Sequence, residues 1–200
     1  CIRDRYITAA GYYKSSINAF ELEKNILDPT WTDYSKRVYF SEYDITPNMI
    51  KGENCLGVTL GNGFYNPLPL RMWGKINLRE RLSVGKPRFI VKIRVTYKNG
   101  RTEEIISDSL WKYSYGPVVK NSVYLGTHYD GRKEIEGWNK TDFDDSDWEN
   151  TVLATPPGGK LQKAFFPPIQ INREIEPQKI YATKEGKWMV DMGENFTGTY

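Results

Sequence analysis

Hydrophobic and polar residues alternate most regularly between residues 88 and 97. The apolar members are Phe89, Val91, Ile93, Val95 and Tyr97. A period of two predicts a strand with one buried and one solvent-facing face. Only Ile90 breaks this alternation, because it places an apolar side chain among the polar positions. Asn99-Gly100 follows, a pair that favours a type I′ turn, and residues 102–106 are the predicted returning strand.

Short strand-like segments fill most of the remaining chain. They are bounded by Gly, Pro, Asn or Asp and cover residues 5–10, 12–17, 38–43, 55–60, 118–124, 179–183 and 188–191. The best helical signal runs from Thr46 to Gly52, where Thr46 would cap, Pro47 would open and Gly52 would end one or two turns. The expected fold class is all-β, a jelly-roll or galactose-binding-like β-sandwich followed by the start of a second β-sandwich.

A segment rich in proline and glycine marks the expected domain boundary. Pro156-Pro157-Gly158-Gly159 is followed by Phe165-Phe166-Pro167-Pro168, and proline cannot donate a hydrogen bond to a strand ladder. About forty residues remain beyond the first run, which is near the lower limit for an independent core. We therefore expect one sandwich over residues 1–154, and a linker with the truncated start of a second sandwich over residues 155–200.

The charge balance narrows the possible partners. The 200 residues carry 28 Lys and Arg against 25 Asp and Glu, a net charge of +3, far from the one-sided basic charge of a protein that follows a phosphate backbone. No apolar run reaches the roughly 18 residues that a membrane helix needs. Nucleic acid and membrane are therefore not expected partners. The chain begins with Cys1 rather than Met, and we expect it to be a mature or excised piece.

Catalytic and metal-binding motifs are sparse. His128 is the single histidine, so neither a histidine-based metal cluster nor a Ser-His-Asp triad is expected. Gly61-Asn62-Gly63 lacks the Lys-Ser/Thr of a phosphate loop, and it is either a plain hairpin loop or a turn whose amide meets a ligand. The acidic run over residues 142–147 lacks the central glycine and distant glutamate of a calcium loop, and it predicts an acidic turn.

Aromatic residues make up 14% of the chain, and several lie in predicted loops. Aromatic rings stack on the apolar faces of sugars, whereas most tryptophans of a β-rich domain belong to the core. Trp73, in a stretch rich in proline and arginine, is the stronger ligand candidate. Tyr65 and Tyr124 are further candidates, while Trp111 and Trp148 are assigned to the core.

Several motifs occur in an order that resembles one enzyme family. They are Leu27-Asp28-Pro29-Thr30-Trp31-Thr32-Asp33-Tyr34, Leu60-Gly61-Asn62-Gly63-Phe64-Tyr65, Tyr129-Asp130-Gly131-Arg132-Lys133-Glu134 and Phe143-Asp144-Asp145-Ser146-Asp147-Trp148. With them, the chain resembles the N-terminal β-sandwich region of bacterial α-L-rhamnosidases (glycoside hydrolase family 78-like) over nearly its whole length. Phe64 stands where that family usually has Trp, and Asn18-Ala19 stands where it has an Asn-Gly turn.

The resemblance implies a non-catalytic module. The family's catalytic carboxylates lie in an (α/α)6 barrel C-terminal to the sandwiches, so no catalytic residue is transferred and the chain is expected to be inactive alone. The resemblance also implies contact with rhamnose-containing carbohydrate, at positions matched by Asn62 and Pro117, to which the loop aromatics Tyr65, Trp73 and Tyr124 are added as candidates. No cofactor is required, and calcium is implied as an optional ligand of Asn62 and the Pro117 carbonyl, since such oxygens suit a hard cation.

Two other functions stay open at this stage. A free-standing lectin-like binding module predicts a reading frame that ends near Tyr200. A complete small glycosidase, using carboxylates such as Asp130 and Glu134, predicts turnover of an aryl rhamnoside. The leading hypothesis is a module that supports the C-terminal catalytic barrel of the same polypeptide and contacts rhamnosyl groups of polysaccharides. Such a parent is expected to be periplasmic or extracellular in a bacterium.

Overall fold

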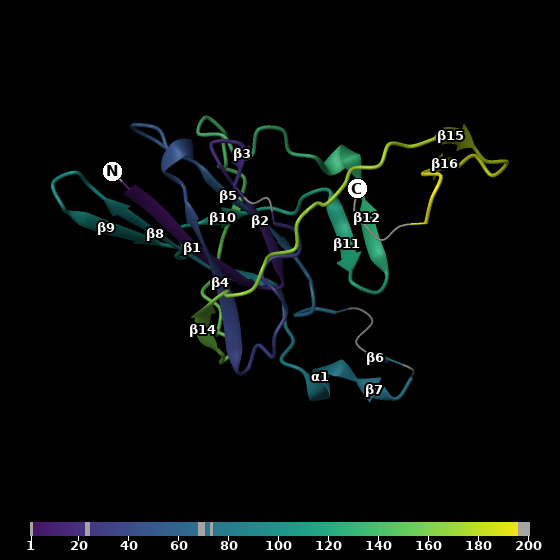
Figure 1. Cartoon of the computed structure of the whole chain (residues 1–200), viewed down its shortest axis with the longest axis horizontal. Helices are drawn as coiled ribbons and strands as arrows, with labels where there is room; N and C mark the ends of the chain where they lie inside the picture. Colours follow the sequence, from purple (N-terminus) through teal and green to yellow (C-terminus); the bar gives the residue numbers. More distant parts are fainter. Residues whose placement is uncertain (1, 23–24, 68–70, 73, 196–200) are drawn as a thin grey trace. The chain divides into compact units, whose positions relative to one another are not determined.

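The computed structural model describes residues 2–22, 25–67, 71–72 and 74–195, and it consists mainly of strands (Figure 1). Its elements are β1 Ile2–Ala10, β2 Tyr12–Ile17, β3 Phe20–Glu21, β4 Arg37–Asp44, the 3-10 helix η1 Thr46–Asn48, β5 Leu56–Gly61, β6 Arg71–Met72, β7 Ile76–Asn77, α1 Leu78–Arg81, β8 Arg88–Thr96, β9 Thr102–Ile106, β10 Lys112–Tyr113, β11 Val118–Ser122, β12 Gly126–Tyr129, the 3-10 helix η2 Gly131–Lys133, β13 Glu149–Asn150, β14 Lys160–Lys163, β15 Lys179–Ala182 and β16 Trp188–Asp191. The all-β class is confirmed.

Five strands form the main sheet, in the order β14-β4-β1-β8-β9. β1 pairs antiparallel with β4 and β8, β8 pairs antiparallel with β9, and β14 runs parallel to β4. The register places Ile7 opposite Val91, and both side chains are buried in one core cluster with Ala9 and Tyr13. The alternation along β8 therefore produces the buried face that its sequence predicts.

A second sheet, β3-β2-β5, supplies the opposite layer. Tyr13 from β2 is buried against Ile7 and Val91 of the main sheet, and Val58 from β5 packs against the same cluster. Two sheets that face each other bury alternate side chains of both. The first part of the chain is therefore the β-sandwich that the sequence predicts.

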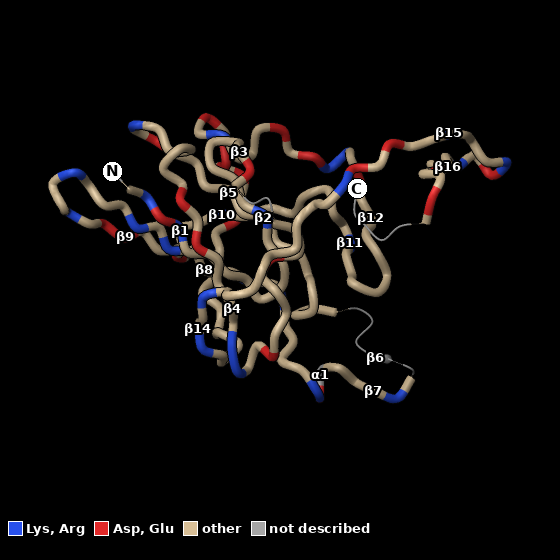
Figure 2. Tube along the Cα trace, viewed as in Figure 1, with Lys and Arg blue, Asp and Glu red and all other residues tan. Residues whose placement is uncertain are grey.

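Charged residues are interspersed along the strands of the main sheet. Figure 2 shows Lys and Arg among Asp and Glu over β1, β8 and β9, as the small net charge predicts. Among the described residues, no helix is both long enough and apolar enough to cross a membrane.

The hairpin loop between β8 and β9 differs from the expected turn. The Gly100 amide donates to the Tyr97 carbonyl at 2.9 Å, and Gly100 has φ +82°. Among the described non-glycine residues, positive φ occurs at Asn18, Ala19 and Leu27, so Asn99 lacks the left-handed conformation that a type I′ turn requires. The type I′ prediction at Asn99-Gly100 was wrong, because this loop is longer and ends on a left-handed glycine.

A left-handed pair lies instead in the hairpin between β2 and β3. Ile17 pairs with Phe20, which leaves Asn18 and Ala19 as the two loop residues, with φ +52° and +69°. Two positive φ angles in a two-residue loop fit a type I′ turn. The Asn18 side chain stabilises it, since its Oδ1 accepts from the Cys55 amide at 3.0 Å.

Replacing Ala19 by glycine is expected to stabilise the protein. A non-glycine L-residue in the left-handed region costs about 1–2 kcal/mol, and the greater freedom of glycine in the unfolded chain offsets part of the gain. We expect the free energy of unfolding to rise by about 0.5–1 kcal/mol, measured by urea denaturation. Ala10→Gly, inside β1, is the matched control and should destabilise. A loss of stability in Ala19→Gly would contradict the turn geometry.

The short helix predicted at residues 46–52 is present as η1, but its first residue has another role. The N-cap position is Ile45, without a capping side-chain bond. The Thr46 amide donates to Asp44 Oδ1, and Thr46 Oγ1 accepts from the Arg3 amide, both at 2.8 Å. Thr46 therefore ties η1 to β1 rather than capping the helix as predicted.

The residues beyond the prolines belong partly to the first sandwich. β14 pairs with β4, with Lys160 opposite Arg37 and Lys163 opposite Phe40. The chain divides into two compact units, Cys1–Ile169 and Gln170–Tyr200, so the first unit extends past the boundary expected at residue 154. The second unit contains the hairpin β15-β16. That it begins a second sandwich stays a prediction.

Candidate functional site

Three aromatic side chains form a row beside the loop that contains Asn62. The Phe64 ring centroid lies 5.1 Å from that of Trp31 and 6.3 Å from that of Tyr124. Trp31 and Tyr124 are about half exposed. We call these three residues the aromatic row. Exposed rings beside amide groups suit the apolar and polar faces of a sugar.

Asn62 is held in place by Asn121 of β11. The Asn62 amide donates to Asn121 Oδ1 at 2.8 Å, and Asn62 Nδ2 donates to the Asn121 carbonyl at 2.9 Å. Asn62 Oδ1 accepts from Asn66 Nδ2 at 2.8 Å. An amide oxygen has two acceptor sites, so Asn62 Oδ1 retains capacity for a ligand hydroxyl beside the aromatic row.

Two glycines allow the Asn62 loop to approach β2 closely. Gly63 has φ +49°, and a Cβ there would lie 3.2 Å from Gly11 Cα. Gly11 has φ +113°, and a Cβ there would collide with the Gly61 carbonyl oxygen. The two backbone segments are in direct contact at this point, and only glycine leaves enough room for such a contact. This contact fixes the loop that carries Asn62 and Phe64.

Asn62 and Pro117 lie at different ends of β11. The Pro117 carbonyl accepts from the Asp130 amide at 2.9 Å just before the strand begins, whereas Asn62 bonds to Asn121 near its end. Four residues of extended chain span roughly 13 Å, while calcium holds its oxygen ligands at about 2.3–2.6 Å. The structure therefore does not bring these two predicted ligands together. Among the described residues, no group of three or more His, Cys, Asp or Glu could hold a metal ion.

Tyr65 has a packing role instead of the expected carbohydrate contact. Its side chain is 3% exposed and belongs to a core cluster with Tyr34. The two rings meet edge to face at 5.1 Å, and the Arg88 guanidinium lies 5.4 Å from the centre of the Tyr65 ring. Neither face of this ring is open to a sugar. Trp73, the other candidate from this stretch, lies outside the described residues.

The carboxylates considered for a small glycosidase are engaged locally. Asp130 accepts two bonds from the Arg132 guanidinium, both at 2.8 Å, and this hydrogen bonding lowers the pKa of the Asp130 carboxyl. The Tyr129 hydroxyl donates to Glu134. A catalytic acid needs a raised pKa to hold its proton near neutral pH. Asp130 is therefore poorly suited to act as a catalytic acid.

The fold is that of a β-sandwich domain, in which a five-stranded sheet packs against a three-stranded one. The family model described as the α-L-rhamnosidase N-terminal domain matches residues 4–173. The chain belongs to this family, which confirms the relationship predicted from its motifs.

Known relatives are much longer than this chain. An α-L-rhamnosidase of Formosa agariphila is 37% identical over 194 residues, which cover 96% of this chain and 20% of the relative. One of Streptomyces avermitilis is 31% identical over 200 residues, 97% of this chain and 18% of the relative. The chain thus spans about a fifth of the length of the curated relatives it matches.

Solved structures show the same relationship in three dimensions. The α-L-rhamnosidase from Dictyoglumus thermophilum is 42% identical with a TM-score of 0.84, covering 98% of this chain and 20% of that one. The Streptomyces avermitilis α-L-rhamnosidase complexed with L-rhamnose is 29% identical with a TM-score of 0.83, covering 97% of this chain and 18% of that one.

Proposed function

We propose that this chain is the non-catalytic N-terminal part of an α-L-rhamnosidase polypeptide and that it supports the catalytic domain of that polypeptide. One observation carries the proposal: nearly the whole chain matches about a fifth of each relative. Asp130 and Glu134 are both engaged in local hydrogen bonds, which supports a role apart from bond cleavage.

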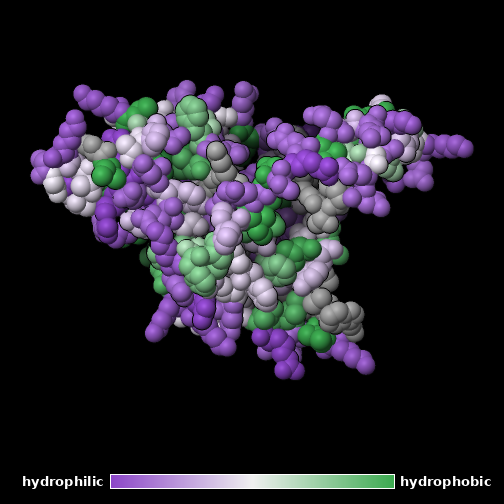
Figure 3. Space-filling model, in the orientation of Figure 1, coloured by the Kyte–Doolittle hydropathy of each residue, from purple (hydrophilic) through white to green (hydrophobic). Residues whose placement is uncertain are grey.

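Exposed apolar side chains are a second observation in favour of a role in supporting the catalytic domain. The Thr151 amide donates to the Trp111 carbonyl at 2.7 Å, which places Leu110 and Val152 in neighbouring segments. Leu110 is 77% exposed and Leu153 is 82% exposed, and Figure 3 shows hydrophobic residues reaching the surface among hydrophilic ones. Isolated soluble domains rarely leave large apolar clusters in water. Further protein is expected to cover these segments.

Activity assays on two forms of the protein test the proposal. We expect the 200-residue chain to leave an aryl α-L-rhamnoside intact, and the complete gene product to hydrolyse it. The control is the same chain added to the complete product, which should not change the rate. A reading frame that ends near Tyr200, or hydrolysis by the 200-residue chain itself, would overturn the proposal.

We also propose that the aromatic row contacts rhamnosyl groups. Two observations favour this contact. The rings of Trp31 and Tyr124 are half exposed, and Asn62 Oδ1 beside them can accept a further hydrogen bond. A relative of the same family has been solved with L-rhamnose, which makes this sugar the first ligand to test.

Calorimetry with L-rhamnose tests the aromatic row. Loss of one stacking ring costs about 0.5–1.5 kcal/mol, so we expect Tyr124→Ala and Trp31→Ala to weaken binding roughly 2- to 13-fold. Tyr115→Ala, which removes an exposed tyrosine that packs on Tyr113, is the matched control and should bind normally. Absence of heat at millimolar sugar would refute the contact. Loss of the binding heat on addition of EDTA would assign a cation to the site. Binding heat that EDTA leaves unchanged would exclude calcium from it.

A further inference from the structure

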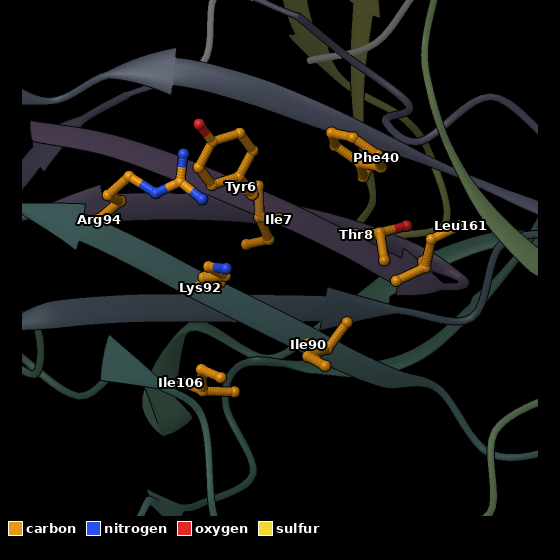
Figure 4. A pocket seen from close by; sticks show the side chains of 9 residues that line it. All are labelled: Tyr6, Ile7, Thr8, Phe40, Ile90, Lys92, Arg94, Ile106 and Leu161. Atoms are coloured by element: carbon orange, nitrogen blue, oxygen red, sulfur yellow. The ribbon is translucent and has the colours of Figure 1, made fainter. Parts of the chain in front are cut away.

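The outward face of the main sheet carries an apolar hollow to which all five strands contribute. Val91 and Ile93 of β8 point into the core, so the alternate residues Ile90 and Lys92 lie on the opposite face. The hollow has a volume of about 360 Å³ (Figure 4). Its side chains include Tyr6 and Thr8 of β1, Phe40 of β4, Ile90 of β8, Ile106 of β9 and Leu161 of β14.

This hollow explains the single break in the alternation of β8. Ile90 stands at a position where water would favour a polar side chain, and it is joined there by Ile106 and Leu161, each about half exposed. Three other strands place an apolar side chain in the hollow, and β1 contributes Tyr6 and Thr8. Strands that are apolar on both faces are typical of sheets covered on both faces. At the hollow, the main sheet is therefore apolar on both faces, while charged side chains such as Lys92, Arg94 and Glu104 occupy the outward face around it.

Charged side chains surround the apolar centre. Glu104 accepts from Lys92 Nζ at 2.7 Å and from Arg94 Nη2 at 3.1 Å, and Arg94 stacks over the Tyr6 ring with 5.7 Å to its centre. Lys163 pairs with Glu42 at the other side. An apolar centre with a polar rim is the anatomy of a protein interface. The scarcity of polar groups in the centre makes it a poor sugar site, because sugars need several hydrogen-bond partners.

We propose that this face, which we call the outer sheet face, binds a segment of the same polypeptide that follows Tyr200. Apolar side chains of that segment fill the hollow. The inference rests on the proposed function, since relatives continue for about four-fifths of their length outside this match. β14 is the last strand to join the sheet and lies at its edge. A segment of the same polypeptide is tethered to the sandwich, which gives it a higher effective concentration than a separate molecule has.

The length of the relatives favours this occupant over a second copy of the chain. Asp4 lies opposite Arg94 across β1 and β8, so the rim has three cations, Lys92, Arg94 and Lys163, against Asp4, Glu42 and Glu104, which is 3 − 3 = 0. A balanced rim does not select an occupant by its net charge, whereas the relatives have about four-fifths of their own length outside this match.

Cysteine labelling of the complete gene product tests the outer sheet face. Ile106→Cys and Ile105→Cys, each in a Cys55→Ser background, differ by one position on β9 and lie on opposite faces of the sheet. In the present structure the two isoleucines are 50% and 55% exposed, so the sandwich alone predicts similar rates. We expect maleimide to label Ile106→Cys at least tenfold more slowly than Ile105→Cys. Mass spectrometry of the labelled peptide measures the two rates.

Each result has a defined meaning. Slow labelling of Ile106→Cys that persists on dilution of a monomeric protein supports the proposal. Equal rates at the two positions overturn it, and so does protection that disappears on dilution of a dimer, since a second copy would then be the occupant. A complete product that hydrolyses the aryl rhamnoside but labels equally at both positions loses only this inference, whereas a gene that ends near Tyr200 removes the proposed function itself.

Discussion

Replacing Asp28 by alanine is expected to lower the free energy of unfolding by about 3–5 kcal/mol. Asp28 Oδ2 accepts from the Tyr13 hydroxyl at 2.6 Å, from Ser41 Oγ at 2.8 Å and from the Tyr43 hydroxyl at 3.1 Å. The carboxylate is 9% exposed, so water cannot readily replace it. Its loss removes three charge-assisted bonds and deprives hydroxyl groups of both sheets of this acceptor.

The protonated state of Tyr13 keeps this network intact over a wide range of pH. Burial, with Asp28 nearby, raises the pKa of the Tyr13 hydroxyl, so it remains a donor at neutral pH. Because the pKa is higher in the folded than in the unfolded protein, this contribution is complete below the unfolded value of about 10 and is lost as pH rises through the folded value.

Urea denaturation of three variants checks the network. Tyr43→Phe removes the longest of the three bonds to Asp28, together with the bond that the Tyr43 hydroxyl accepts from Asn25 Nδ2. It should cost about 1–2 kcal/mol, which makes it the graded control. Asp33→Ala is the exposed control, because Asp33 bonds to Ser35 within its own turn. If Asp28→Ala were no more destabilising than Asp33→Ala, the three-bond network would not be a source of stability.

Replacing Gly11 by alanine is expected to destabilise the protein by about 3 kcal/mol or more. The new Cβ would collide with the Gly61 carbonyl oxygen and lie 3.3 Å from the Asn62 carbonyl oxygen. The backbone at φ +113° adds strain of its own, since L-residues rarely adopt it. Both neighbours are backbone atoms, so no rotation of a flexible side chain can relieve the contact.

Gly100→Ala is the matched control for this prediction. Gly100 also has a positive φ, +82°, but no atom lies within 4 Å of its would-be Cβ. Gly100→Ala should therefore lower the stability by about 1 kcal/mol, which is the cost of placing alanine in the left-handed conformation. Thermal unfolding measures the loss of stability in both variants. Equal losses would show that the Asn62 loop moves away from β2 without a cost in free energy. Because the collision displaces Asn62, Gly11→Ala should also weaken any sugar binding at the aromatic row.

The local elements were predictable because strand periodicity is a local property. The strands predicted at residues 12–17, 102–106 and 188–191 have those bounds in the structure. Alternation requires only that one face of each strand be buried. The motifs likewise identified the family, which the match over residues 4–173 confirms.

The candidate site was harder to predict because its parts are distant in sequence. Trp31, Phe64 and Tyr124 come from three separate loops, and Phe64 was considered only as a departure from the family motif. Tyr65 follows it directly, and the motif alone does not say which of the two neighbours is buried. The tertiary contacts decide that: Tyr65 packs in the core with Tyr34, whereas Phe64 packs on Trp31 and Tyr124.

By itself, the sequence determined the all-β class, most strand positions and the family, because these depend on periodicity and motifs that neighbouring residues carry. Only the tertiary structure decided that β14 joins β4 in parallel, that Tyr65 packs in the core, and that Ile90 belongs to a five-strand apolar face. Each of these depends on contacts between residues far apart in the chain, and local patterns do not specify which distant strands meet.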